Sequence, residues 1–144
     1  MKNKFLSRAR VVFYSLIIIF VLLVLYFAIP FAHEIKRALF PAVAVLGFLF
    51  FLLGGALVYF TFKSKVKGKL KVFLLLTGFY AVGVLVCVLL HNFVYGLMIY
   101  LFGEGIWGEG GDEALFFILA LIVCPIVFLV GMIGSLVVLR RGKK

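Results

Sequence analysis

Acidic residues and cysteines are scarce in this sequence, and the common motifs of soluble enzymes are missing. Its 144 residues include five aspartates and glutamates, two cysteines, three prolines and one tryptophan. The two cysteines, Cys87 and Cys124, lie far apart in apolar stretches, which excludes a CxxC motif and a framework of paired disulfides. No phosphate-binding glycine loop, HExxH or GxSxG pattern occurs. We therefore expect no enzymatic activity and no cofactor.

Charge of either sign is also sparse, because charged residues make up 14% of the chain and hydrophobic residues 67%. Soluble domains contain about 25% charged and about 45–50% hydrophobic residues. So few charges cannot cover this much apolar surface in water, which excludes a soluble enzyme, a secreted disulfide scaffold, a coiled coil and a disordered tail. With a mean hydropathy of +1.32, the composition is that of an integral, multi-pass membrane protein.

Four apolar stretches are long enough to cross a membrane, since about 20 helical residues span a hydrocarbon core of roughly 30 Å. No stretch alternates like a barrel strand, and unpaired backbone groups are costly in lipid, so all four are predicted to be helices. The predicted fold is a single all-α domain over 1–144, a four-helix antiparallel transmembrane bundle. Its third helix is over-long or bent at the outer interface. The spans cover residues 11–29, 38–62, 72–92 with an extension to 102, and 114–139.

Basic residues are distributed between the spans in a way that orients the chain. Thirteen of the 15 lie in the N-terminal tail, the loop between the second and third spans, and the C-terminal tail, where no acidic residue occurs. All five acidic residues lie in the other two loops. Because cytoplasmic loops are rich in Lys and Arg, we predict that both termini are cytoplasmic. The net charge of +10 thus indicates topology rather than nucleic-acid binding, and suits a prokaryotic cytoplasmic membrane.

Two groups of residues are candidates for contact with the membrane surface. Five lysines alternate along the loop between the second and third spans, and contact with anionic headgroups of the inner leaflet is worth about 1 kcal/mol for each. A topology signal alone is the alternative. At the opposite interface Tyr95, Tyr100 and Trp107 are predicted to be aromatic anchors. The lysines are Lys63, Lys65, Lys67, Lys69 and Lys71.

A thiol or metal site is the third possibility that the residues offer. Cys87, His91 and Tyr95 share one helix face because they are spaced four apart. Cys87 lies about 24 Å and Cys124 about 22 Å from the cytoplasmic ends of their helices, so the thiols have similar depth. Together with His91 they are competent ligands for zinc or copper, and the thiols alone are competent to form a disulfide. We favour ordinary packing, because buried free cysteine acts as a small hydrophobe, and we predict no metal site.

Small residues and one proline predict how the helices pack. Gly47 with Gly54, and Gly131 with Ser135, form pairs on single helix faces, which favour close approach of helices in lipid. Pro125 removes one backbone hydrogen bond within the fourth span and predicts a kink there.

The predicted function rests on these features. No Asp, Glu, Lys or Arg lies within any predicted span, which argues against proton- or ion-coupled transport. The favoured function is a structural, lipid-interacting or accessory membrane subunit, with anionic lipid as its partner. The alternatives are an oligomeric channel or lipid or solute carrier, and a thiol or metal site of Cys87, His91 and Cys124. Assembly as a homo-oligomer or within a larger membrane complex stays open.

Overall fold

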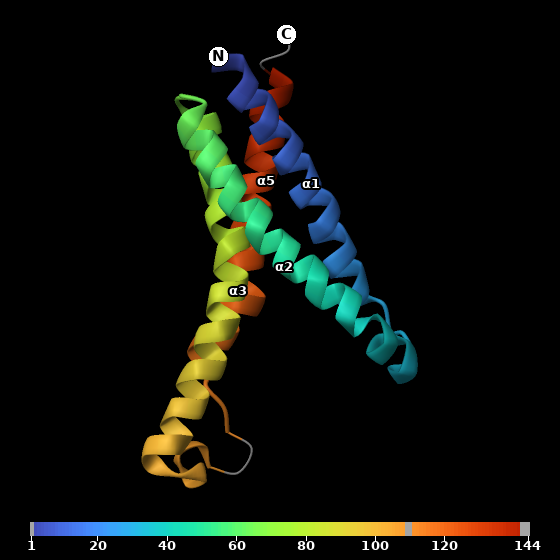
Figure 1. Ribbon diagram of the computed structural model, residues 1–144, viewed down its shortest axis with the longest axis vertical. Coiled ribbons are helices and arrows are strands. Elements are labelled where there is room, and N and C mark those ends of the chain that lie inside the picture. Colours follow the sequence, from blue (N-terminus) through green and yellow to red (C-terminus); the bar gives the residue numbers. More distant parts are fainter. Residues whose placement is uncertain (1, 109–110, 142–144) are drawn as a thin grey trace.

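Helices account for nearly all of the protein that the computed structural model describes, which is residues 2–108 and 111–141 (Figure 1). Within these residues, four helices are long and apolar enough to cross a membrane, which confirms the predicted number of helices of that kind. In chain order the elements are α1 (Lys2–Ala28), α2 (His33–Lys63), α3 (Lys69–Phe102), the 3-10 turn η1 (Glu104–Trp107), α4 (Ala114–Ile118), the π-helical segment η2 (Leu119–Val123) and α5 (Cys124–Arg141).

The third helix is over-long, as predicted. Its 34 residues form one unbroken helix of about 51 Å, which exceeds the thickness of a hydrocarbon core. Gly103 ends it with a φ of +85°, a backbone conformation that favours glycine, and donates its N–H to the carbonyl of Ile99. Residues 93–102 therefore continue α3 as helix without a break and lead into the turn η1.

The helices form two hairpins arranged as a V (Figure 1). One hairpin consists of α1 and α2, and the other of α3 with the rod α4–η2–α5. The start of α1, the end of α5 and the α2–α3 turn lie together where the hairpins meet, which we call the basic end. The other two loops lie at the opposite, open end, where the hairpins diverge (Figure 1). The predicted antiparallel order of helices is present, but the bundle is closed at one end only.

Glycines bring α2 and α3 into backbone contact where the hairpins cross. A Cβ added to Gly54 would lie 2.9 Å from the carbonyl oxygen of Gly78, so no side chain separates the two helices there. Close approach of this kind replaces the hydrophobic drive that lipid does not supply. A Cβ added to Gly47 would meet nothing within 4 Å. The prediction that Gly47 belongs to a packing seam was wrong, because α2 has already diverged from α3 at that height.

A second seam joins α3 to α5 and matches the prediction. Gly131 packs against Thr77, since an added Cβ would lie 2.7 Å from the Thr77 hydroxyl, and Ser135 is fully buried one turn further along α5.

Three phenylalanines connect the two hairpins. The ring of Phe128 on α5 lies 4.6 Å from that of Phe20 on α1 and 5.1 Å from that of Phe50 on α2, between ring centroids. The rest of the core lies between this cluster and the basic end. The face of α1 that carries Phe20 becomes exposed toward the open end, where Phe27 is 68% exposed. The fully or nearly buried members of the core include Ala9, Phe13, Leu16, Leu57, Leu74 and Leu139.

The predicted kink at Pro125 takes the form of a π-helical turn. Pro125 has no N–H to donate to the preceding turn. Just before it, the N–H of Cys124 donates to the carbonyl of Leu119, five residues earlier, instead of to the usual fourth. The wider turn keeps α4, η2 and α5 in one continuous rod and changes which side of that rod faces α3.

Candidate functional site

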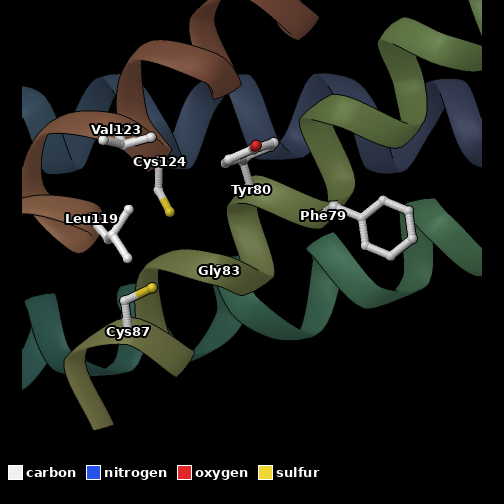
Figure 2. A pocket seen from close by; sticks show the side chains of 7 residues that line it. All are labelled: Phe79, Tyr80, Gly83, Cys87, Leu119, Val123 and Cys124. Carbon is white, nitrogen blue, oxygen red and sulfur yellow. The ribbon is translucent and has the colours of Figure 1, made fainter. Parts of the chain in front are cut away.

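Cys87 and Cys124 line the same pocket, so the structure brings the two predicted thiols together. Cys87 is on α3, and Cys124 is the first residue of α5, directly after the π-helical turn. Figure 2 shows both sulfur atoms turned toward the space between these helices. Both cysteines are free thiols. The pocket has a volume of about 480 Å³, and its other lining residues are Phe79, Tyr80, Gly83, Leu119 and Val123.

A glycine lets the Cys124 sulfur rest directly on α3. A Cβ added to Gly83 would lie 3.1 Å from the Cys124 Sγ, tighter than most side-chain contacts allow. Gly83 is one helical turn before Cys87, and residues four apart on a helix lie about 5–6 Å from each other. The Cys87 and Cys124 thiols therefore face each other across the same pocket. The predicted equal depth of the two cysteines thus corresponds to a true interhelical pair.

His91, the third predicted member of the thiol or metal site, belongs to another cluster. Its Nδ1 lies 2.9 Å from the Glu113 carbonyl oxygen and 3.2 Å from Glu113 Oε2, while its Nε2 lies 3.6 Å from Asp112 Oδ2. It does not line the thiol pocket. Over residues 2–108 and 111–141, no group of three or more His, Cys, Asp or Glu side chains is placed to hold a metal ion. Cys87, His91 and Cys124 therefore do not form one site in this structure.

Glu113 links this second cluster to the start of the fourth span. Its carboxylate accepts hydrogen bonds from the N–H groups of Leu115 at 2.7 Å and Phe116 at 3.0 Å, and so caps the start of α4. Desolvation of the carboxylate acts to raise the pKa of Glu113. The hydrogen bonds from Phe116, His91 and Leu115 outweigh it and hold this pKa below its usual value. The carboxylate is thus the anionic partner of His91 near neutral pH.

The predicted aromatic anchors divide into two kinds. Tyr95 stacks on His91 with 6.4 Å between ring centroids, and Trp107 stacks on Tyr95 at 6.0 Å. The rings of His91, Tyr95 and Trp107 thus form one stack at the open end of the second hairpin. Tyr100 points away from the molecule and is 85% exposed. Whether any of the three anchors the chain at a lipid interface stays a prediction.

The five predicted headgroup-contact lysines lie at the basic end. Lys63 is the last residue of α2 and Lys69 the first of α3, and the turn between them has positive φ values at Lys65 and Gly68. The ammonium group of Lys63 lies 5.8 Å from the Tyr59 ring centroid. That of Lys71 lies 5.3 Å from the ring of Phe62. Aromatic rings hold these two side chains near the helices, and Lys65, Lys67 and Lys69 occupy the turn or its edge.

Sequence reasoning did not pair His91 with Glu113, which are 22 residues apart. The sequence contains an acidic residue just before the fourth span and a histidine in the third, but their spacing gives no indication that the two side chains meet. Tyr80 was also missed as a neighbour of the thiols, because a tyrosine in an apolar span gives no separate signal.

No family model, curated protein or solved structure that was compared with this chain matches it.

Proposed function

We propose that this chain is a non-enzymatic integral membrane protein that crosses a cytoplasmic membrane four times with both termini on the cytoplasmic side. It acts as a structural, lipid-interacting or accessory subunit. The separation of charge between the two ends of the molecule supports this proposal most strongly. Lysines and arginines from three separate segments gather at the basic end, and the acidic residues that the structure describes, Glu34, Glu104, Asp112 and Glu113, lie in or beside the loops of the open end.

The basic end presents its cations as a group because the fold brings the three segments together (Figure 1). The start of α1 contributes Lys4, Arg8 and Arg10, the end of α5 contributes Arg140 and Arg141, and the α2–α3 turn contributes its five lysines. Each cation near an anionic membrane surface contributes about 1 kcal/mol of attraction. Several such cations on one surface favour lipids with more than one negative charge over zwitterionic lipids.

Exposed apolar surface supports a role for the helices in contact with lipid or a partner. Within the most apolar window of each spanning helix, only 11–22% of the residues are buried in the monomer. Toward the open end the two hairpins diverge (Figure 1). Large apolar side chains on both hairpins are exposed there, among them Phe27, Phe40 and Phe93. Acyl chains or the helices of another subunit can cover such apolar surface.

Cysteine labelling tests the orientation. In a variant with Cys87→Ser and Cys124→Ser, Lys67→Cys and Gly105→Cys are made one at a time and treated with a membrane-impermeant maleimide in intact cells. We expect labelling of Gly105→Cys only, and labelling of Lys67→Cys after the membrane is opened. Labelling of both positions from outside the cell contradicts the proposed topology.

Lipid retention tests the proposed interaction. We expect the purified protein to keep anionic lipid in native mass spectrometry, and the double substitution Lys65→Gln and Lys67→Gln to reduce the amount retained. Lys36→Gln with Arg37→Gln, at the open end, is the matched control with the same loss of charge. Equal retention by both double variants contradicts the role of the basic end.

A further inference from the structure

We propose that Cys87 and Cys124 are a redox-active dithiol, which a lipid-soluble quinone oxidises to a disulfide between α3 and α5. This inference is independent of the proposed function, since it concerns the pocket at the π-helical turn and not the basic end. It assigns chemistry to two thiols that neither the orientation nor the contact with lipid requires.

The first support for this proposal is that the two thiols face the same pocket. Their sulfur atoms point into one pocket (Figure 2), and the Cys124 sulfur rests on the backbone of Gly83, one turn from Cys87. A disulfide needs Cβ atoms about 3.5–4.5 Å apart. Cys87 and Cys124 line one pocket from two helices that pack against each other, so the bond would join side chains that already face the same space.

The apolar surroundings favour a disulfide over a metal ion. The pocket walls are aromatic or aliphatic except for the phenol of Tyr80. Two thiolates around one Cu(I) ion leave a net negative charge, which is costly to bury in such surroundings. A disulfide is neutral, so its formation leaves no buried charge. The described residues also supply no third ligand for a metal here.

The position and walls of the pocket favour a lipid-soluble oxidant. Cys87 lies 16 residues beyond Lys71, or about 24 Å along α3 from the basic end, and one helical turn before His91. The pocket is reached from the lipid-facing side, where Phe79 is 54% exposed and Cys87 is half-buried. The pocket has a volume of about 480 Å³ and is open on that side. Aromatic walls suit a quinone ring, and the Tyr80 hydroxyl is a donor for one of its carbonyl oxygens.

The reaction balances without a further reactant. The more accessible thiol, that of Cys87, adds through sulfur to a ring carbon of the quinone, and its proton passes to a carbonyl oxygen. The Cys124 sulfur then attacks the Cys87 sulfur, the S–S bond forms, and the S–C bond breaks. The departing hydroquinone keeps the electron pair and takes the proton of Cys124 on its second oxygen. Two thiols lose two electrons and two protons, and one quinone gains them.

The experiment uses the full chain, reduced and reconstituted in lipid nanodiscs without oxygen, with a decyl-substituted benzoquinone as the probe. We expect the intact mass to fall by two hydrogen atoms and one quinol to form per chain, followed by its absorbance. Cys87→Ser and Cys124→Ser each abolish both signals. Absence of the disulfide overturns the proposal, and so does a disulfide that forms only with a water-soluble oxidant and without quinol.

Paired glycine variants test the geometry. Gly83→Ala places a methyl group against the Cys124 sulfur, and we expect quinol formation to slow about tenfold, as misplacement of reacting groups does. Gly96→Ala on the same helix adds its methyl group in open space and leaves the rate unchanged. Tyr80→Phe retains the pocket but removes its hydroxyl, and slows the reaction without preventing the disulfide. Equal rates for Gly83→Ala and Gly96→Ala overturn the proposed approach of the two sulfurs.

Discussion

His91 on α3 is hydrogen-bonded to Glu113, the residue that caps the start of the fourth spanning helix. The imidazole lies 2.9 Å from the Glu113 carbonyl oxygen and 3.2 Å from its carboxylate, and both side chains are largely buried. His91 thereby joins α3 to the start of α4 at the open end, where the two hairpins have diverged (Figure 1).

Replacement of His91 therefore destabilises the second hairpin. We expect His91→Ala to lower the free energy of unfolding by about 1–3 kcal/mol, because the Glu113 carboxylate loses a partner in a buried setting. Thermal or denaturant unfolding in detergent measures the change. Asn92→Ala is the control, since the Asn92 side chain is exposed and bonds only to the Val88 carbonyl of its own helix. An equal loss in both variants contradicts the role of the His91 contact.

Acid should weaken the same junction. The folded protein holds the pKa of Glu113 below its ordinary value of 4.5, so this carboxylate stabilises the fold above pH 4.5. Its contribution is lost as the pH falls through the lower folded pKa. We expect the melting temperature of the native chain to drop more than that of Glu113→Gln between pH 6 and pH 3 (about the range in which carboxylates titrate). Parallel pH profiles contradict this assignment.

The crossing of α2 and α3 depends on the absence of a side chain at Gly54. We expect Gly54→Ala to destabilise the protein by about 1–3 kcal/mol, since its Cβ would lie 2.9 Å from both the Gly78 carbonyl oxygen and the Ala81 Cβ. Gly55→Ala is a closely matched control, because a Cβ at the next residue meets nothing within 4 Å. Unfolding in detergent distinguishes the two, and a gain of stability in both variants contradicts the close contact.

The phenylalanine cluster holds the two hairpins together at the height where they begin to diverge. We expect Phe128→Ala to cost at least about 2 kcal/mol, because it leaves a cavity beside Phe20 and Phe50 that lipid cannot fill. Phe93→Ala removes an equal volume from a side chain that is 63% exposed, and serves as the control. A distance measurement between spin labels on α1 and α5 checks whether the hairpins separate. An unchanged distance and stability contradict the importance of this cluster.

The amino-acid sequence alone determined the number of helices, their approximate bounds and the segregation of charge. Long apolar stretches permit only hydrogen-bonded helix in lipid, and the clusters of Lys and Arg lie in alternate connections. The over-long α3 was predictable for the same reason, since the 31 residues before Gly103 contain no Asp, Glu, Lys or Arg.

The tertiary structure alone decided which faces of the helices meet. The spans are apolar on all sides, so no amphipathic stripe indicates how each helix is rotated about its axis. The divergence of the hairpins decides that Gly54 packs while Gly47, on the same face of α2, does not. The height of each residue along α3 decides that His91 contacts Glu113, one turn beyond the cysteine pocket. The π-helical turn adds one residue before Cys124, which rotates α5 relative to α4 by about 100°. The meeting of Cys87 with Cys124 depends on this rotation, which hydropathy does not encode.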